Sequence, residues 1–283
     1  MRIIKSVAEM QAYSGSQRSK NIKIGFVPTM GALHEGHLSL LKRSTETADQ
    51  TILSIFVNPA QFSPSEDFNE YPRDFKTDEE SARNSGVDAI FYPSVEEIYP
   101  DGYSTFSVVE GLSDILDGVS RPSHFKGVTT IVNKLFNIVN PHMAFFGQKD
   151  AQQAVIIKKM VTDLNLNVEI IVCPTIRDED GLALSSRNAF LNREEREQAP
   201  MIYTALTRAE SMHAGGEHES SKIISLIEGI ISSAKLAKID YIAVVDEETL
   251  QPVESTLSGV LVAAAVFFGG TRLIDNTILP PKD

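Results

Sequence analysis

Short apolar runs alternate with amphipathic stretches along residues 1–175. The apolar runs predict strands at Ile22–Val27, Thr51–Val57, Ala89–Tyr92, Met143–Phe146 and Val168–Cys173. The intervening stretches predict helices at His37–Ala48, Asp74–Asn84, Phe125–Val139 and Ala151–Leu164. Strands that alternate with helices are typical of a doubly wound parallel sheet, so we expect a Rossmann-like α/β domain here.

The pattern changes after Pro174. Thr175–Asn188 is polar without apolar periodicity, which predicts a loop. The remainder predicts helices at Arg193–His213 and Ser221–Leu236, then strands at Tyr241–Val245, Gly259–Phe268 and Leu273–Asp275. Helices followed by strands favour a smaller α+β domain, so the expected domains are residues 1–175 and 176–283. The longest apolar run, Gly259–Gly270, is too short to span a bilayer and is expected to be a buried strand.

Charge and cysteine content limit the possible functions. Lys and Arg number 26 against 38 Asp and Glu, a formal net charge of −12. This acidity argues against a nucleic-acid partner, although a local basic pocket still permits a nucleotide substrate. A single cysteine, Cys173, excludes an intrachain disulfide. The N-terminus lacks the apolar core of a signal peptide, so we expect a cytoplasmic protein without a membrane partner.

The loop after the first predicted strand carries the strongest candidate chemistry. A strand, a glycine-bearing turn and a helix start form a typical phosphate-binding arrangement. The spacing of Gly31 and Gly36 imitates a P-loop, but His37-Leu38 stands where Lys-Ser/Thr is required. His34 and His37 lie three residues apart and are suited to donate hydrogen bonds to phosphate oxygens. A structural histidine pair or half of a metal site are the alternatives.

Two further segments follow predicted strands. Asn58 and Gln61 offer neutral amides to a hydroxyl or carboxylate, or form an ordinary Asn-Pro turn. After Phe146, Lys149 is placed for a phosphate, Asp150 for a ribose hydroxyl and Gln153 for a substrate oxygen. The alternative for this second segment is a capped helix with solvated polar residues.

Three other polar groups are weaker candidates. Ser185, Ser186 and Arg187 suit a loop that closes on phosphates, or else belong to a surface linker. Arg121-Pro122-Ser123-His124-Phe125-Lys126 either faces the substrate anion or forms a solvated turn. Asp74 and Asp78 are weak candidates for Mg²⁺ through water, against a solvated helix face.

Together these segments resemble the pantoate–β-alanine ligase (pantothenate synthetase) family. Pro28–His37 is similar to that family's variant of the HIGH signature of nucleotidyltransferases, and Leu184–Asn188 to its KMSKS loop. Further matches are NPAQF, YPRD, HFKGV, KLFNIVNP and FGQKDAQQ. The likeness is strongest over roughly residues 20–190 and continues more weakly to the C-terminus. Gln148, Ala151 and Leu184 depart from the usual family residues.

The resemblance implies an ATP-dependent condensation of pantoate with β-alanine. Pantoate would attack the α-phosphorus of ATP, releasing pyrophosphate, and β-alanine would then displace AMP from the pantoyl adenylate. Neither step needs a protein nucleophile, which fits the absence of a G-x-S-x-G motif. The resemblance further implies Mg²⁺ and a homodimer, with the second domain acting as a lid.

The resemblance also implies residue roles. Catalytic roles fall to His37, His34, Lys149 and Arg187. ATP contacts fall to Met30, Gly31, Ala32, Leu33, His34, Glu35, Gly36, His37, Gly147, Gln148, Lys149, Asp150, Ile176, Leu184, Ser185, Ser186 and Arg187. Pantoate contacts fall to Pro28, Met30, Gln61 and Gln153, and Gln61 also contacts β-alanine.

Two functions of other kinds compete with this one. Another HIGH-type nucleotidyltransferase that releases pyrophosphate would share the histidine pair, but the neutral Asn58, Gln61 and Gln153 favour a carboxylate or hydroxyl substrate. A nucleotide-binding regulator that lost the chemistry would keep the fold. The intact His34 and His37 argue against it.

Overall fold

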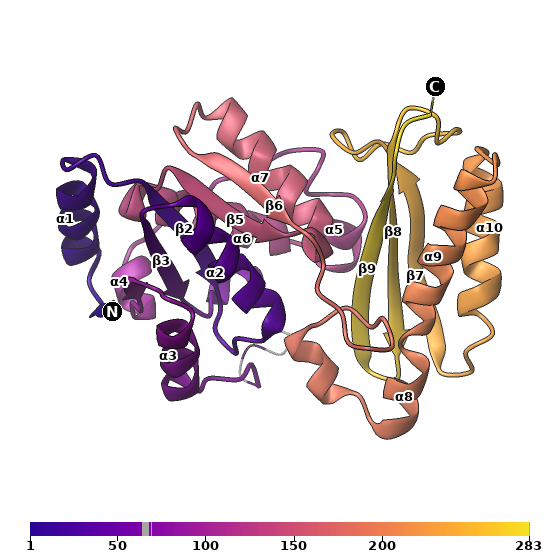
Figure 1. The fold of residues 1–283 in the computed structure, drawn as a ribbon, viewed down its shortest axis with the longest axis horizontal. Coiled ribbons are helices and arrows are strands. Elements are labelled where there is room, and N and C mark those ends of the chain that lie inside the picture. Colours follow the sequence, from indigo (N-terminus) through magenta and orange to yellow (C-terminus); the bar gives the residue numbers. More distant parts are fainter. Residues whose placement is uncertain (64–67, 69, 283) are drawn as a thin grey trace. The chain divides into compact units, whose positions relative to one another are not determined.

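The computed structural model describes residues 1–63, 68 and 70–282 and divides into two compact units (Figure 1). Unit 1 comprises Met1–Gln148 and Ile156–Pro174, and unit 2 comprises Lys149–Val155 and Thr175–Asp283. Helix α7 (Ala151–Asp163) therefore contributes its first residues to unit 2 and the rest to unit 1.

Unit 1 is built on a six-stranded parallel sheet in the order β1-β4-β3-β2-β5-β6. The strands are β1 (Arg2–Ile4), β2 (Ile24–Thr29), β3 (Gln50–Ile55), β4 (Ala89–Phe91), β5 (Met143–Gly147) and β6 (Glu169–Cys173). This confirms the predicted α/β class. The first strand was not predicted, because three residues are too few to show a period. The strand order reverses at β2 and β5, which pair with each other, so their carboxyl ends form the switch point where such sheets bind ligands.

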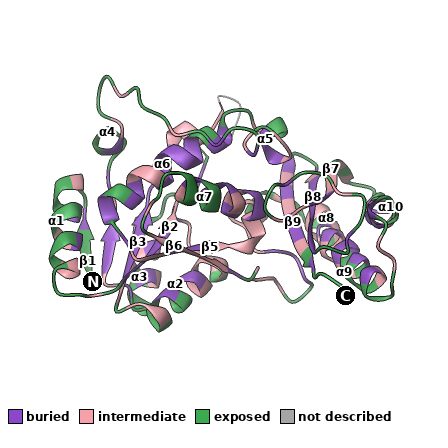
Figure 2. Cartoon of the chain, turned by 90° about the horizontal axis from the view of Figure 1, so that it is seen from above, coloured by how far each residue is buried: buried purple, intermediate pink, exposed green. Residues whose placement is uncertain are grey.

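Helices cover both faces of this sheet. Besides most of α7, the helices of unit 1 are α1 (Val7–Arg18), α2 (Glu35–Thr47), α3 (Phe75–Asn84), α4 (Val95–Ile98), α5 (Asp117–Ser120) and α6 (His124–Val139), with a 3₁₀ turn η1 (Pro59–Gln61). Helices α2 and α3 contact each other on one face, and α6 packs with α1 on the other (Figure 2). Right-handed crossovers between parallel strands produce this separation, because the chain progresses in opposite directions on either side of the switch point.

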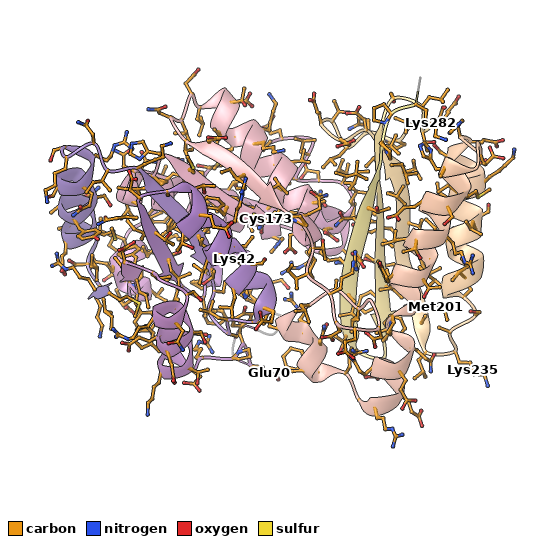
Figure 3. The ribbon with its side chains drawn as sticks, viewed as in Figure 1. Lys42, Glu70, Cys173, Met201, Lys235 and Lys282 are labelled. Carbon is orange, nitrogen blue, oxygen red and sulfur yellow. The ribbon has the colours of Figure 1, made fainter. Side chains whose placement is uncertain are left out.

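The core under α2 and α3 contains a cluster of apolar side chains. Val27, Leu53 and Ile90 of the strands pack against Leu41 and other buried side chains of the two helices. The single cysteine, Cys173 at the end of β6 (Figure 3), belongs to this cluster, and burial raises the pKa of its thiol. Strands that are buried on both faces read as continuous apolar runs, which explains why the sequence pattern located them.

Unit 2 contains a three-stranded antiparallel sheet in the order β7-β8-β9. Its elements are η3 (Ser186–Phe190), α8 (Arg193–Gln198), α9 (Met201–Ala214), α10 (Ser220–Ile231), β7 (Ala237–Val245), β8 (Val260–Phe268) and β9 (Thr271–Leu279). The central strand β8 is the predicted buried apolar strand. The outer strands extend beyond their predicted limits, because edge positions alternate in polarity and shorten the apparent run. No helix within the described residues is long and apolar enough to cross a bilayer.

The predicted helix Arg193–His213 is wrong as a single element. The chain forms α8 and α9 instead, which are separated at Ala199 and Pro200. Proline has no N–H to continue the helical ladder, and its ring clashes with the carbonyl four residues earlier. The second predicted helix, Ser221–Leu236, likewise ends earlier, at Ile231.

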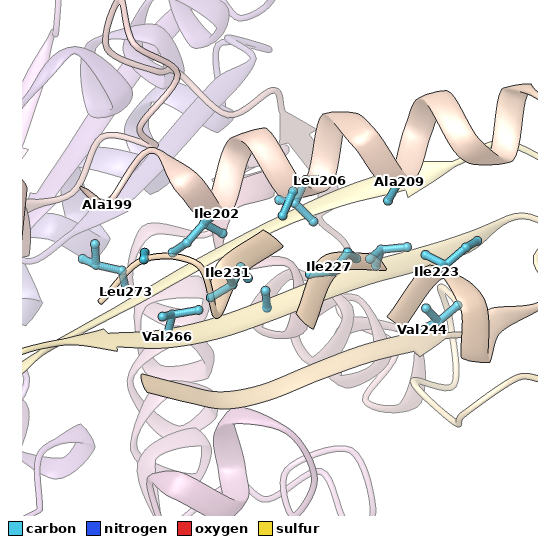
Figure 4. Close-up of a cluster of buried hydrophobic side chains, with 14 of the residues drawn as sticks. Ala199, Ile202, Leu206, Ala209, Ile223, Ile227, Ile231, Val244, Val266 and Leu273 are labelled. Carbon is cyan, nitrogen blue, oxygen red and sulfur yellow. The ribbon is translucent and has the colours of Figure 1, made fainter. Parts of the chain in front are cut away.

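The core of unit 2 lies between this sheet and helices α9 and α10 (Figure 4). Ile202 and Leu206 of α9 and Ile223 and Ile227 of α10 belong to one buried cluster with Val266 of β8. Each of these side chains is at most 2% exposed, so each gains the full hydrophobic contribution of a buried aliphatic group.

We expect Ile227→Ala to lower the free energy of unfolding by about 2–5 kcal/mol, and Ile227→Val by about 0.5–1.5 kcal/mol. The larger loss arises because the alanine leaves a cavity between α10 and the sheet. Urea denaturation followed by circular dichroism measures both. Ile278→Val, at a side chain that is 42% exposed, is the control and should change stability by less than about 0.5 kcal/mol. Equal losses at residues 227 and 278 would contradict this account of the core.

Candidate functional site

The loop between β2 and α2 has an unusual backbone that a buried acid holds in place. Gly31 and Ala32 are consecutive residues with positive φ, of 86° and 51°. Asp78, on α3 and 4% exposed, accepts hydrogen bonds from the N–H of Ala32 at 3.0 Å and of Leu33 at 2.8 Å. Hydrogen bonds to an ionised acceptor are among the strongest in proteins, so the loop shape is fixed by this carboxylate.

Asp78 therefore has a structural role as the anchor of this loop, and the metal ligation suggested by the sequence stays a prediction. Each of its two oxygens already accepts a backbone N–H. A Cβ at position 31 would lie 2.7 Å from Oδ2 of Asp78, so the loop requires glycine for space as well as for its φ angle. Among the described residues, no three His, Cys, Asp or Glu side chains form a group that could hold a metal ion.

The two histidines of the loop cap the start of α2. Nδ1 of His34, the N-cap residue, accepts the N–H of Gly36 at 3.2 Å, and Nδ1 of His37 accepts the N–H of His34 at 3.3 Å. The ring centroids are 4.1 Å apart. Because both Nδ1 atoms accept, the proton of each neutral imidazole belongs on Nε2. The structural role on Nδ1 thus leaves an N–H donor on Nε2 of each ring, and donation from there to phosphate stays a prediction.

Gln61, at the end of η1, is held by a chain of hydrogen bonds. Asn58 is 1% exposed; its Oδ1 accepts from the hydroxyl of Tyr99 at 2.7 Å, and its Nδ2 donates to Oε1 of Gln61 at 3.1 Å. Nε2 of Gln61 in turn contacts Sδ of Met30 at 3.0 Å. Burial raises the pKa of Tyr99, so its hydroxyl stays protonated and able to donate. Two predicted pantoate contacts, Met30 and Gln61, thus lie together.

Helix α6 supports the backbone of Gln61. The guanidinium of Arg121 lies 2.9 Å from Nε2 of His124 and can only donate, so Nδ1 carries the ring proton and donates to the carbonyl of Gln61 at 2.9 Å. A Cβ at Gly127 would lie 2.2 Å from the carbonyl oxygen of Ala60, so only glycine permits this close packing. His124, which the sequence suggested as an anion contact, therefore positions a neighbouring residue.

In unit 2, adjacent residues of β9 hold two predicted phosphate-binding segments. Nδ2 of Asn276 donates to the carbonyl of Lys149 at 2.9 Å. Asp275, 4% exposed, forms a two-pronged ion pair with Arg177 at the base of the Thr175–Asn188 loop. Lys149 also lies 3.5 Å from the carboxylate of Asp150. The contact of Asn276 with Lys149 was not predicted from the sequence, because the two residues lie far apart in the chain.

The Thr175–Asn188 loop is ordered by its own polar groups. The N–H of Leu184 donates to the carbonyl of Ile176 at 3.0 Å, which places these two predicted adenine contacts opposite each other. Oγ of Ser185 accepts the N–H of Arg187 at 3.3 Å and begins η3. Nδ2 of Asn188 donates to the carbonyl of Ala183 at 3.0 Å. The N–H of Leu184 is therefore already paired within the loop.

The predicted site residues divide between the units. Unit 1 contains Pro28, Met30, Gly31, Ala32, Leu33, His34, Glu35, Gly36, His37, Gln61, Asp78, Gly147 and Gln148. Those from Pro28 to His37 lie on or just before the α2 cap, and Gly147 ends β5, which pairs with β2. Unit 2 contains Lys149, Asp150, Gln153, Ile176, Leu184, Ser185, Ser186 and Arg187.

The parallel sheet has its switch point beside the start of α2, and this helix start carries two imidazole donors. Such an arrangement is typical of nucleotide-binding α/β proteins of the Rossmann-like class. The family model for pantoate-beta-alanine ligase matches residues 2–278. The chain belongs to that family.

The chain is similar in sequence and in structure to known pantothenate synthetases over nearly their full lengths. The chain is 54% identical to the pantothenate synthetase of Acetivibrio thermocellus, with 99% of both chains covered, and 52% identical to that of Thermotoga petrophila, over 99% of this chain and 100% of the relative. The crystal structure of the Thermus thermophilus pantothenate synthetase superposes with a TM-score of 0.94 at 41% identity, covering 99% of this chain and all of the other. A Francisella tularensis pantoate-beta-alanine ligase, complexed with "Beta-gamma ATP" and β-alanine, superposes with a TM-score of 0.80 at 37% identity, covering 98% and 97%.

We expect Asp78→Ala to speed hydrogen exchange at the amides of Ala32 and Leu33 by about tenfold or more, because both lose a charged acceptor. Exchange monitored by nuclear magnetic resonance gives the rates. Asp74→Ala is the control, because Asp74 caps the same helix through Thr77 and does not contact the loop. If Asp74→Ala accelerated both amides equally, fraying of α3 would be the cause and the anchor role would be wrong.

Proposed function

We propose that the protein joins pantoate and β-alanine at the expense of ATP, forming pantothenate, AMP and diphosphate. The observation that carries this proposal is the family match over residues 2–278. The capped pair of imidazoles, His34 and His37, supports it from the geometry, because both rings present an Nε2–H donor at a helix N-terminus.

In the first step an oxygen of the pantoate carboxylate attacks the α-phosphorus of ATP. A new P–O bond forms, the bond to the β-phosphate oxygen breaks, and pyrophosphate leaves. Negative charge grows on the phosphate oxygens during this displacement, and preorganised N–H donors stabilise it. His34 and His37 supply such donors from unit 1, and His37 is assigned the proton to the departing pyrophosphate. Lys149 and Arg187 are assigned to the triphosphate with Ser185 and Ser186.

In the second step the amine of β-alanine attacks the acyl carbon of pantoyl adenylate. The C–N bond forms, AMP leaves with the bonding electron pair, and the amine loses a proton. We assign Gln61 to both carboxylic substrates, because the Asn58 and Met30 contacts hold its side-chain amide in one orientation. Gln153, Met30 and Pro28 complete the pantoate contacts. Orienting both substrates supplies the rate without a protein nucleophile.

The nucleoside contacts and the metal ion complete the proposal. The remaining ATP contacts are assigned to Gly31, Ala32, Leu33, Glu35, Gly36, Gly147, Gln148, Asp150, Ile176 and Leu184. Mg²⁺ keeps several waters and binds substrate phosphates with few protein ligands, so we assign it to the triphosphate and not to Asp78. The HIGH-type loop, a homodimer and a lid role for residues 176–283 are proposed from the family resemblance, and a cytoplasmic location is proposed from the N-terminal sequence.

The first test is exchange of labelled pyrophosphate into ATP with pantoate present and β-alanine absent. We expect exchange that requires pantoate, because the adenylate forms reversibly, and AMP with pantothenate once β-alanine is added. AMP formation without prior exchange would remove the free adenylate from the mechanism. Folded protein that gives neither exchange nor AMP would overturn the substrate assignment.

A second test concerns Asn276. Asn276→Ala removes the donor to the Lys149 carbonyl, so we expect the KM for ATP to rise about fivefold while kcat changes less. Steady-state kinetics measure the two constants. Thr277→Ala is the matched control, because that neighbouring side chain contacts Glu210 instead. An unchanged KM for ATP in Asn276→Ala would show that this bond does not position Lys149 for the nucleotide.

A further inference from the structure

Unit 1 contains a cavity of about 440 Å³ that no proposed substrate contact lines. It lies where the start of α1 and the segment after α4 face helix α6, and its wall has two kinds of surface. Val7, Ile98 and Ile138 form an apolar part, while Tyr103 and Lys134 present polar groups. A volume of this size accommodates a small organic molecule.

Lys134 is a cation without an acidic partner at this cavity. Its Nζ lies 4.3 Å from the ring centre of Tyr103 and 5.6 Å from that of Tyr99. Within the described residues, no carboxylate approaches Nζ within ion-pair distance. Burial lowers the pKa of Lys134, since desolvation disfavours its charge. The aromatic rings offset part of that cost, and an anion in the cavity would offset more.

Two hydroxyl groups of the cavity lining can donate to an anion beside Lys134. Burial raises the pKa of Tyr103, so its hydroxyl stays protonated. Nδ2 of Asn133 donates to Oγ of Ser107 at 2.9 Å, which leaves the Ser107 hydroxyl proton able to donate into the cavity. The acidic lining residue is Glu97, whose Oε1 accepts the N–H of Val7 at 2.6 Å. Lys134 can compensate one negative charge on a ligand, and the carboxylate of Glu97 opposes any further one.

We propose that this cavity binds a small monocarboxylate with a short apolar body. The carboxylate pairs with Lys134 and the hydroxyl of Tyr103, and the apolar body lies on Val7, Ile98 and Ile138. A phosphate is disfavoured, because its second charge and its lack of an apolar body match neither Glu97 nor the aliphatic wall.

The cavity is connected by contacts to a residue of the proposed reaction. The ring of Tyr99 faces the ammonium group of Lys134. The hydroxyl of Tyr99 donates a hydrogen bond to Asn58, and Asn58 donates one to Gln61. Pairing of Lys134 with an anion weakens its hold on the tyrosine rings, so occupancy changes the packing of Tyr99. We therefore expect a bound carboxylate to change the KM for β-alanine; this part rests on the proposed function.

The binding test uses 3-methylbutanoate and its neutral analogue 3-methylbutanamide in calorimetric titrations of the whole protein. Saturating pantoate is present so that the proposed substrate site is filled. We expect 3-methylbutanoate to bind, the amide to bind at least tenfold more weakly, and inorganic phosphate to bind more weakly than 3-methylbutanoate. Equal binding of acid and amide would overturn the proposal, as would tighter binding of phosphate.

Variants locate the binding. Lys134→Met keeps the length of the side chain and removes its charge, so we expect at least tenfold weaker binding. Tyr103→Phe removes one hydroxyl and should weaken binding about threefold, which covers the case in which Lys134→Met fails to fold. Lys42→Met, at an exposed lysine of α2 (Figure 3), is the matched control and should bind as the wild type does. Binding unaffected by both cavity variants would overturn the site.

The kinetic part is tested separately. In the wild type, 3-methylbutanoate should change the KM for β-alanine at least twofold, and in Lys134→Met it should not. Carboxylate binding with no effect on KM would overturn the connection through Tyr99 while leaving the site. Failure of pyrophosphate exchange with intact Lys134-dependent binding would overturn the proposed function alone.

Discussion

The carboxylate of Asp78 sustains a loop conformation that the chain would not hold unaided. Two successive left-handed residues cost about 1 kcal/mol or more where the second is alanine. Two charge-assisted hydrogen bonds, each contributing about 1.5–3 kcal/mol, exceed that cost. This loop shape places His34 in the extended backbone conformation that an N-cap residue requires. The orientation of the imidazole donors therefore follows from an acid on a different helix.

In unit 2, side chains of one strand likewise hold polar segments in place. Asp275 and Asn276 are buried neighbours on β9, and each holds a different polar segment by its side chain. Arg177, which Asp275 binds, also lies 4.3 Å from the ring centre of Tyr203. Truncating one member of such a buried pair leaves its partner charge uncompensated, which is more costly than the pair itself is favourable. Both segments are thus attached to a strand of the sheet of unit 2.

The sequence predicted the sheet well because its strands are continuous apolar runs, and local motifs gave the family and the general position of the site. The break at Pro200 was missed in the prediction of a single helix, because the apolar pattern continues on both sides of the proline. The supporting residues could not be predicted. Asp78 lies 46 residues from Ala32, and Asn276 lies 127 from Lys149. A single polar side chain has no period, so its partner is defined only once the chain has folded.

The double use of each imidazole restricts what evolution can place at these two positions. Asparagine or serine at position 34 and glutamate or glutamine at position 37 would satisfy the same backbone N–H groups, since these residues form the usual capping box. None of these side chains also provides a second donor on the far side of a rigid ring, as Nε2 does. The backbone contacts of the two histidines could therefore be made by ordinary capping residues, whereas the Nε2 atoms of the two rings could not be replaced by them.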